Sequence, residues 1–191
     1  MSDYDSTQDT MAHIGKVQEY IAACIDSLRF RAKVHDASKL LSPEKEAFDE
    51  MTPILSGLTY GSDEYKAGIA RLGPALEHHY FVYTHHPEHY PDGVNGMSLL
   101  DVLEMLCDWK AASERHANGD IARSLRINGE RFGISKQLTA ILENTAVELE
   151  WMEADPIVDP IANLRRSDFE RMAAERQGKK PPAISHGSSA A

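Results

Sequence analysis

The chain has 191 residues, of which 42% are hydrophobic and 26% charged, and its formal net charge is −10 at pH 7. This composition is typical of a globular protein, and the negative charge argues against binding to a nucleic-acid polymer, though not to a small phosphorylated substrate held by local cations. We expect a cytoplasmic protein without membrane association, because Met1 to Thr10 do not resemble a signal peptide and no apolar run approaches the roughly 18 residues of a membrane span.

Helical periodicity dominates the chain, and no segment alternates as a strand would. In the first predicted helix the apolar residues recur at intervals of three and four, as in an amphipathic helix; they include Ile14, Val17, Ile21, Ile25 and Leu28. The sequence predicts helices over residues 11–28, 30–40, 42–56, 62–86, 98–117, 120–127 and 135–152, with a loop over 87–96. Cys24 and Cys107 lie in apolar helical patterns and are expected to be buried thiols.

The fold class that follows is all-α. We expect residues 1–155 to form a single helical domain with a divalent-metal site between its helices. Residues 156–177 are expected to be a peripheral segment and residues 178–191 a disordered tail, because the composition there shifts to prolines, charges and then Gly, Ser and Ala.

The predicted helix at 98–117 carries acids on a largely apolar background. Asp101, Glu104 and Asp108 lie at i, i+3 and i+7, so they share one face of a helix that should be buried nearly all round. A buried carboxylate needs a cation or a hydrogen-bond partner. Asp101 is expected to cap its own helix. Glu104 fits an ion pair with an arginine as well as a catalytic role, and Asp108 is the strongest site candidate.

A His35-Asp36 pair precedes Lys39 by about one turn, so Asp36 and Lys39 should lie on the same side of a helix. Together with His13 and Asp108, the pair supplies two nitrogens and two carboxylates. Such a set suits a divalent ion and leaves coordination positions open, as a catalytic metal site requires.

Five of the nine histidines fall between residues 78 and 89. His78 and His85 are seven residues apart and would share a helix face, and His79 and His86 form the alternative pair. Periodicity alone leaves both pairings open.

Two segments resemble the HD-domain superfamily of metal-dependent phosphohydrolases. His35-Asp-Ala-Ser-Lys39 is similar to its His-Asp-x-Gly-Lys signature, with Ser38 in place of glycine. His85-His-Pro-Glu-His-Tyr-Pro-Asp-Gly93 is similar to the His-His-Glu stretch followed by Asp-Gly in members that cleave cyclic dinucleotides, and Asp108 follows at a similar interval. The Gly-Tyr-Pro element of those members is missing here, which disfavours a cyclic dinucleotide substrate. Over about Met11 to Leu149 the chain also resembles a small phage- and prophage-associated family of unassigned function.

The resemblance implies that one metal is held by His13, His35, Asp36 and Asp108, that Asp36 can bridge to a second metal, and that His79 and His85 belong to that second site. We therefore expect a metal-dependent phosphohydrolase with one or two divalent ions (Mn, Co, Zn, Fe or Mg). Its substrate would be a nucleotide, as for a deoxynucleoside monophosphatase or a dNTP triphosphohydrolase. A homodimer is the oligomer that the resemblance favours.

The expected roles follow from position. Asp36, Lys39 and Glu104 are the candidates for catalysis, and Lys39, His86 and Arg123 for substrate binding. Two other functions stay open: a di-iron oxygenase of a small polyol or phosphonate with the same architecture, and a non-catalytic binding module stabilised by metal.

Overall fold

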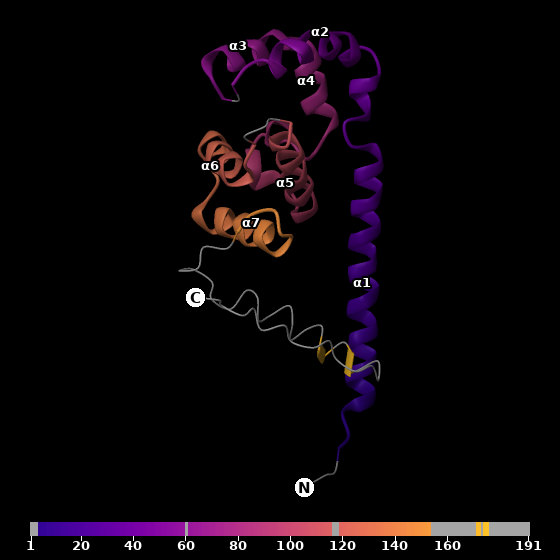
Figure 1. Cartoon of the computed structure of the whole chain (residues 1–191). Helices are drawn as coiled ribbons and strands as arrows, with labels where there is room; N and C mark the ends of the chain where they lie inside the picture. Colours follow the sequence, from indigo (N-terminus) through magenta and orange to yellow (C-terminus); the bar gives the residue numbers. More distant parts are fainter. Residues whose placement is uncertain (1–3, 60, 116–118, 154–170, 173, 176–191) are drawn as a thin grey trace, which may run out of the picture. The chain divides into compact units, whose positions relative to one another are not determined.

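A computed structural model of the chain describes residues 4–59, 61–115 and 119–153, together with 171–172 and 174–175. These residues form helices and no β-strand, so the predicted all-α class is confirmed (Figure 1). The α-helices are α1 (Thr7–Val34), α2 (Glu44–Ser56), α3 (Asp63–Arg71), α4 (Gly73–Val82), α5 (Leu99–Ser113), α6 (Ile121–Phe132) and α7 (Lys136–Glu148). Short 3-10 helices, η1 (Ala37–Leu40), η2 (Pro87–His89) and η3 (Gly93–Gly96), lie between them.

α1 is one continuous helix of 28 residues, whereas the sequence predicted two helices that meet near residue 29 (Figure 1). The segment between Leu28 and Val34 contains neither glycine nor proline, and its Arg and Ala residues favour the helical conformation. Nothing therefore stops the helix before His35.

The predicted helix over 62–86 is two helices, and its last residues are not helical. Ser62 caps α3 by accepting a hydrogen bond from the amide of Tyr65. Leu72 lies between α3 and α4, and Gly73, the first residue of α4, has φ of 43°, a conformation that glycine adopts at little cost. α4 ends at Val82 and Tyr83 is extended, so His85 and His86 lie in a turn.

α5 begins with the predicted capping box, in which Ser98 and Asp101 exchange hydrogen bonds between side chain and backbone. The expectation that α5 is buried nearly all round is wrong, because Leu99 is 81% exposed and Cys107 is also exposed. Cys24 on α1 is exposed as well, so neither cysteine is the buried thiol that its apolar neighbours predicted.

α6 begins at the cap Asp120, whose carboxylate accepts from the amide of Ala122, and ends at Gly133 in the left-handed conformation. It continues to Phe132, five residues beyond its predicted end. α5 packs against α1 and α6, and α2 packs against α3 and α4. The buried apolar residues of these helices include Met51, Ala75, Val102, Met105, Leu106, Trp109, Ile121 and Leu125.

The chain divides into two compact units, Met1–Thr139 and Ala140–Ala191, and α7 begins in the first and continues into the second. The predicted boundaries at residues 155 and 177 and the predicted tail at 178–191 lie outside the described residues. Within the described ranges, none of the helices combines the length and the apolar character that crossing a membrane requires.

Candidate metal centre

A sharp corner after α1 carries the His-Asp pair. His35 and Asp36 form a turn in which His35 has φ of −50° and ψ of 126°, and Asp36 is left-handed with φ of 55°, a conformation that aspartate tolerates better than most residues. The Tyr83 hydroxyl holds the corner, since it donates to the Val34 carbonyl at 3.2 Å and accepts from the Ser38 amide at 2.8 Å. The corner places both side chains of the pair between α4 and α5.

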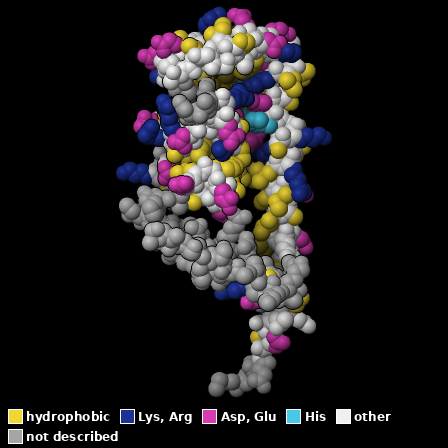
Figure 2. All heavy atoms as spheres, viewed as in Figure 1, with side chains coloured by type: hydrophobic (Ala, Val, Ile, Leu, Met, Phe, Trp, Pro, Cys, Tyr) yellow, Lys and Arg dark blue, Asp and Glu magenta, His cyan; other side chains and the backbone are white. Residues whose placement is uncertain are grey.

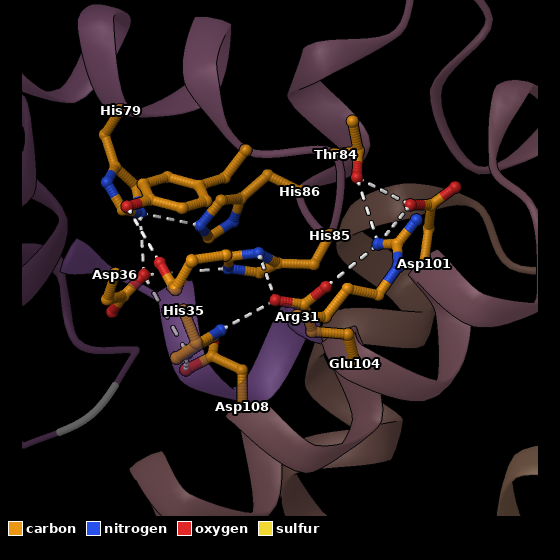
Figure 3. Close-up of polar contacts among 12 residues, drawn as sticks. Arg31, His35, Asp36, His79, Thr84, His85, His86, Asp101, Glu104 and Asp108 are labelled. Atoms are coloured by element: carbon orange, nitrogen blue, oxygen red, sulfur yellow. Dashed lines mark hydrogen bonds and ion pairs between the residues drawn. The ribbon is translucent and has the colours of Figure 1, made fainter. Parts of the chain in front are cut away.

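Six residues from three parts of the chain meet at this corner, and we call them the His/Asp cluster: His35, Asp36, His79, His85, His86 and Asp108 (Figure 3). The Oδ1 atom of Asp36 lies 3.2 Å from Nε2 of His79 and 3.8 Å from Nε2 of His85. Nε2 of His35 lies 3.8 Å from both Oδ1 of Asp36 and Oδ1 of Asp108. The cluster therefore joins the end of α1, α4 with the turn after it, and α5.

The ligand atoms form overlapping groups in which every atom lies within 4.8 Å of the others. These groups are Asp36 with His79, His85 and His86; His35 with Asp36 and Asp108; and His35 with His85 and Glu104. Asp36 belongs to two of them, so its carboxylate is placed to contact two neighbouring cations. Both histidines of the open pairing, His85 and His86, join the same group as His79.

The cluster contains buried polar atoms without hydrogen-bond partners, and such atoms indicate whether a metal ion fits the site. His85 is 1% exposed, and neither of its ring nitrogens makes a hydrogen bond. Oδ1 of Asp36 is likewise buried without one. Leaving such atoms unpaired costs free energy, and a divalent cation with imidazole and carboxylate ligands would satisfy both. The residues present therefore fit a metal ion.

Glu44 anchors one imidazole of the cluster from behind. The side chain of Glu44 is fully buried. Its Oε2 atom lies 2.9 Å from Nδ1 of His79, and its Oε1 atom lies 2.7 Å from Nδ1 of His78. Burial opposes ionisation of Glu44, but the contacts with His78 and other neighbours hold its pKa below the usual value. An ionised Glu44 accepts hydrogen bonds, so Nδ1 of His79 donates and Nε2 remains to face Asp36.

Glu104 anchors a second imidazole and is itself held by an arginine. Oε1 of Glu104 lies 2.9 Å from Nδ1 of His35, and Oε2 accepts from Arg31 at 3.0 Å. The ion pair with an arginine that the sequence allowed for Glu104 is thus present. Both oxygens of this carboxylate are engaged, which is the geometry of a residue that orients a ligand.

Arg31 also pairs with Asp101, at 2.7 Å (Figure 3). Asp101 accepts further hydrogen bonds from Thr84, Tyr90 and its capping partner Ser98. Burial opposes both charges, but Glu104 and Asp101 raise the pKa of Arg31, and the hydrogen bonds from Ser98, Thr84 and Arg31 lower the pKa of Asp101. One network therefore ties α1, the turn after α4 and α5 together beside the cluster.

Lys39 donates to Oδ2 of Asp36 at 2.6 Å and lies 4.9 Å from the centre of the Phe48 ring. The predicted proximity of Asp36 and Lys39 is confirmed. Burial opposes ionisation of Asp36, but its contacts with His79 and Lys39 hold the pKa of its carboxyl far below the usual range. The ammonium of Lys39 therefore pairs with the carboxylate of Asp36, which belongs to two of the ligand groups.

The histidines of the cluster differ in charge. The contact with Asp108 raises the pKa of His35 to about 9, against the opposing effect of burial, and the same contact outweighs burial to lower the pKa of Asp108. Burial, with the neighbouring His85 and His79, lowers the pKa of His86 to about 3. Burial lowers the pKa of His85 as well. His85 and His86 are therefore neutral near pH 7, the form in which imidazole binds metals.

The structure does not bring His13 into the cluster, and its prediction as a metal ligand is corrected here. His13 is exposed on α1, and because that helix is continuous, the 22 positions to His35 separate the two residues by about 33 Å. The sequence predicted separate helices over 11–28 and 30–40, whereas α1 continues without a break to Val34.

Other candidates also lie away from the cluster. Arg123 is exposed on α6, and none of the ion pairs described joins it to the cluster. Two residues of η2 also contact other parts of the chain: Glu88 pairs with Arg131 at 2.7 Å, and Nδ1 of His89 lies 2.9 Å from the carbonyl oxygen of Tyr80.

The sequence reasoning missed Glu44 and Arg31. Glu44 continues the face of α2 on which Phe48 and Met51 lie, and a carboxylate on an apolar face is the signal that could have found it. Arg31 gives no such signal, because its partners Asp101 and Glu104 are about 70 residues away.

A pocket of about 550 Å³ opens beside the cluster. Its wall is formed by apolar and aromatic side chains, including Phe30, Val34, Val82 and Tyr83, and Arg31, His85 and Glu104 also line it. A concave surface with apolar walls and a few polar groups is the usual form of a small-molecule site.

Residues 2–148 match a protein family described as a family of unknown function (DUF5662). No curated protein and no solved structure matches the chain.

Proposed function

We propose a function from the site itself, because the chain belongs to DUF5662, a family of unknown function. The chain acts as a metal-dependent hydrolase of phosphoric esters or anhydrides, with a nucleotide as substrate. The observation that supports this is the overlap of the ligand groups at Asp36, next to the buried His85 whose ring nitrogens have no hydrogen-bond partner.

The cluster suits one or two divalent ions from the set Mn, Co, Zn, Fe and Mg. When bound, such an ion supplies Lewis acidity, which polarises a phosphoryl oxygen and makes water a stronger nucleophile at neutral pH. Asp36 can contact two ions at once, with His35 and Asp108 on one side and His79, His85 and His86 on the other. Glu44 and Glu104 orient His79 and His35 through their Nδ1 atoms.

The chain's own residues would position the substrate and the attacking water. Oδ1 of Asp36, which is buried and makes no hydrogen bond inside the protein, would be a ligand of the ion that activates this water. Lys39 supplies a cation for the equatorial oxygens of the phosphoryl group once a metal takes its place on Asp36. The apolar pocket beside His85 would receive the base or sugar.

The HD-domain likeness supports the same reading. The His-Asp pair sits at a turn after a helix, and Asp108 reaches it from another helix. The first histidine of that arrangement has no counterpart in the cluster, because His13 is distant. Three protein ligands, His35, Asp36 and Asp108, remain for that metal, and water or substrate would take the other positions.

The test is release of phosphate, pyrophosphate or triphosphate from a panel of deoxynucleoside monophosphates and triphosphates. The chain is first stripped with a chelator and then reconstituted separately with Mn²⁺, Co²⁺, Zn²⁺, Mg²⁺ or Fe²⁺. We expect release with at least one ion, and its loss in Asp36→Asn and Asp108→Ala. Asp49→Asn is the matched control, because Asp49 makes a similar ion pair with Lys45 on the surface. Full activity of both folded cluster variants would refute the proposal.

The same samples separate the two other functions. Oxygen uptake by the iron form, without phosphate release from any nucleotide, would favour the di-iron oxygenase, for which a cluster of four histidines and two aspartates also supplies ligands. Metal binding that raises the melting temperature, with neither reaction, would favour a binding module.

A further inference from the structure

α1 presents an apolar surface that the structure leaves exposed. None of its 28 residues is buried, and Val17, Ile21 and Ile25 are 40%, 54% and 42% exposed. Figure 2 shows hydrophobic side chains gathered along this helix. α1 is held to α5 at its last turn, through Arg31, whereas the apolar surface extends several turns toward the N-terminus. A contiguous exposed apolar surface of this kind marks an interaction site.

The spacing of the apolar residues is the same in both directions. The branched aliphatic residues Ile14, Val17, Ile21, Ile25 and Leu28 are separated by three, four, four and three positions, so their pattern is symmetric about Ile21. These positions share one face of the helix. We call them the α1 stripe.

A symmetric stripe is complementary to itself in the antiparallel orientation. A second copy related by a two-fold axis at Ile21 sets Ile21 against its own counterpart, Val17 against Ile25 of the second copy, and Ile14 against Leu28 of the second copy. Such an interface is isologous, the kind that closes a two-fold dimer.

The charges at the ends of α1 favour the same orientation. Asp9 lies in its first turn, and Arg29 and Lys33 lie near its end. Antiparallel pairing about Ile21 brings Asp9 level with Lys33 of the second copy and opposes the two helix dipoles. Parallel pairing would bring ends of like charge together.

We propose that the α1 stripe is a homodimer interface in which α1 pairs with α1 of a second copy, antiparallel about Ile21. The stripe spans 14 helical steps, or about 21 Å. It is therefore expected to bury less than the roughly 800 Å² per partner of a standard interface, and the dimer should dissociate on dilution. This inference does not depend on the proposed enzymatic function.

The first test measures the mass of the full chain by sedimentation at increasing concentration. We expect the mass of the unchanged chain to double as the concentration rises. The variant Ile21→Glu should remain monomeric, because it would bring one carboxylate from each copy together at the two-fold axis. Leu99→Glu is the control, since Leu99 is an exposed apolar residue on another helix, and it should dimerise like the unchanged chain. Circular dichroism checks that each variant is folded. A monomer at all concentrations, as expected if another part of the same chain covers the α1 stripe, would overturn the proposal.

The second test fixes the orientation by disulfide cross-linking with oxidised glutathione. Cys24 and Cys107 are first replaced by serine, because both are exposed. Ile21→Cys should cross-link to itself. Val17→Cys and Ile25→Cys should each fail alone but cross-link when mixed. Self-linking of Val17→Cys without mixed cross-links would mean parallel pairing and would contradict the antiparallel arrangement.

Discussion

Glu44 and His79 form a buried pair in which a carboxylate oxygen lies 2.9 Å from Nδ1 of the imidazole, and both side chains are almost completely shielded from solvent. The pair fixes which nitrogen of His79 faces the cluster. Partners of this kind fix the tautomer and the orientation of the imidazole that binds the metal.

Replacing Glu44 should therefore weaken metal binding. In Glu44→Gln the volume is kept but the charge that holds Nδ1 of His79 is lost, and we expect the affinity for Zn²⁺ or Co²⁺ to fall about 10- to 100-fold. Calorimetric titration measures this, and the visible spectrum of the Co²⁺ form reports the ligand geometry. Glu50→Gln is the control, because Glu50 lies on the same helix in an exposed pair with Arg71. Equal affinity of Glu44→Gln and the unchanged chain would exclude the anchoring role.

Lys39 should compete with the metal for Asp36. Its ammonium lies 2.6 Å from the carboxylate that two ligand groups share. In Lys39→Met we expect metal affinity to rise about tenfold, equivalent to about 1.4 kcal/mol, because the metal no longer displaces a cation. Phosphate release should fall in the same variant, since a cation for the phosphoryl oxygens is lost. The surface pair of Lys45 with Asp49 supplies the control Lys45→Met. A lower metal affinity in Lys39→Met would contradict the competition.

Arg31 should contribute more to stability than its neighbours on α1. It pairs with the buried carboxylate of Asp101 and with Glu104, and its removal leaves Asp101 without a cation and Glu104 with His35 alone. Breaking a buried pair of this kind costs about 3–5 kcal/mol. We expect Arg31→Met to lower the free energy of unfolding by that amount in urea titrations. Arg29→Met, two residues earlier in an exposed pair with Asp26, should change it by less than about 0.5 kcal/mol. Similar losses in both variants would rule out the network as the cause.

The metal-free chain should lose stability as the pH rises through the pKa of His35. The contact with Asp108 raises that pKa to about 9, while an unfolded histidine has a pKa of about 6.5. The folded state binds the proton more tightly, so the stabilisation is fully present below about pH 6.5 and is lost as the pH approaches 9. The unfolding free energy of the unchanged chain, minus that of His35→Asn, should therefore shrink over this window in the presence of a chelator. A difference that stays constant or grows would show that His35 is not protonated in the folded chain.

The parts of the site that could be predicted are those encoded by short intervals. The capping box of Ser98 and Asp101 and the contact of Asp36 with Lys39 each span three residues, so helical geometry was enough to predict them. The position of His13 depended instead on where α1 ends. No glycine or proline marks a break between Leu28 and His35, so α1 continues, and the resemblance that implied a ligand role for His13 says nothing about where this helix ends.

The pairing of the histidines could not be predicted because it depends on the backbone after α4. Periodicity assumed a helix as far as His86, but Tyr83 is extended and both His85 and His86 turn inward. Once the helix ends at Val82, the seven-residue interval no longer selects one partner for His79.

α5 carries three acidic residues with different roles: Asp101 caps the helix, Glu104 holds the imidazole of His35, and Asp108 belongs to the His/Asp cluster. Because all three lie on one helix, their spacing along the sequence fixes their relative positions. One residue inserted between Asp101 and Glu104 would turn everything after it by about 100° while the cap stayed in place. Protein engineers who graft or lengthen segments in this chain should therefore make their changes before Ser98, where the helix has not yet begun.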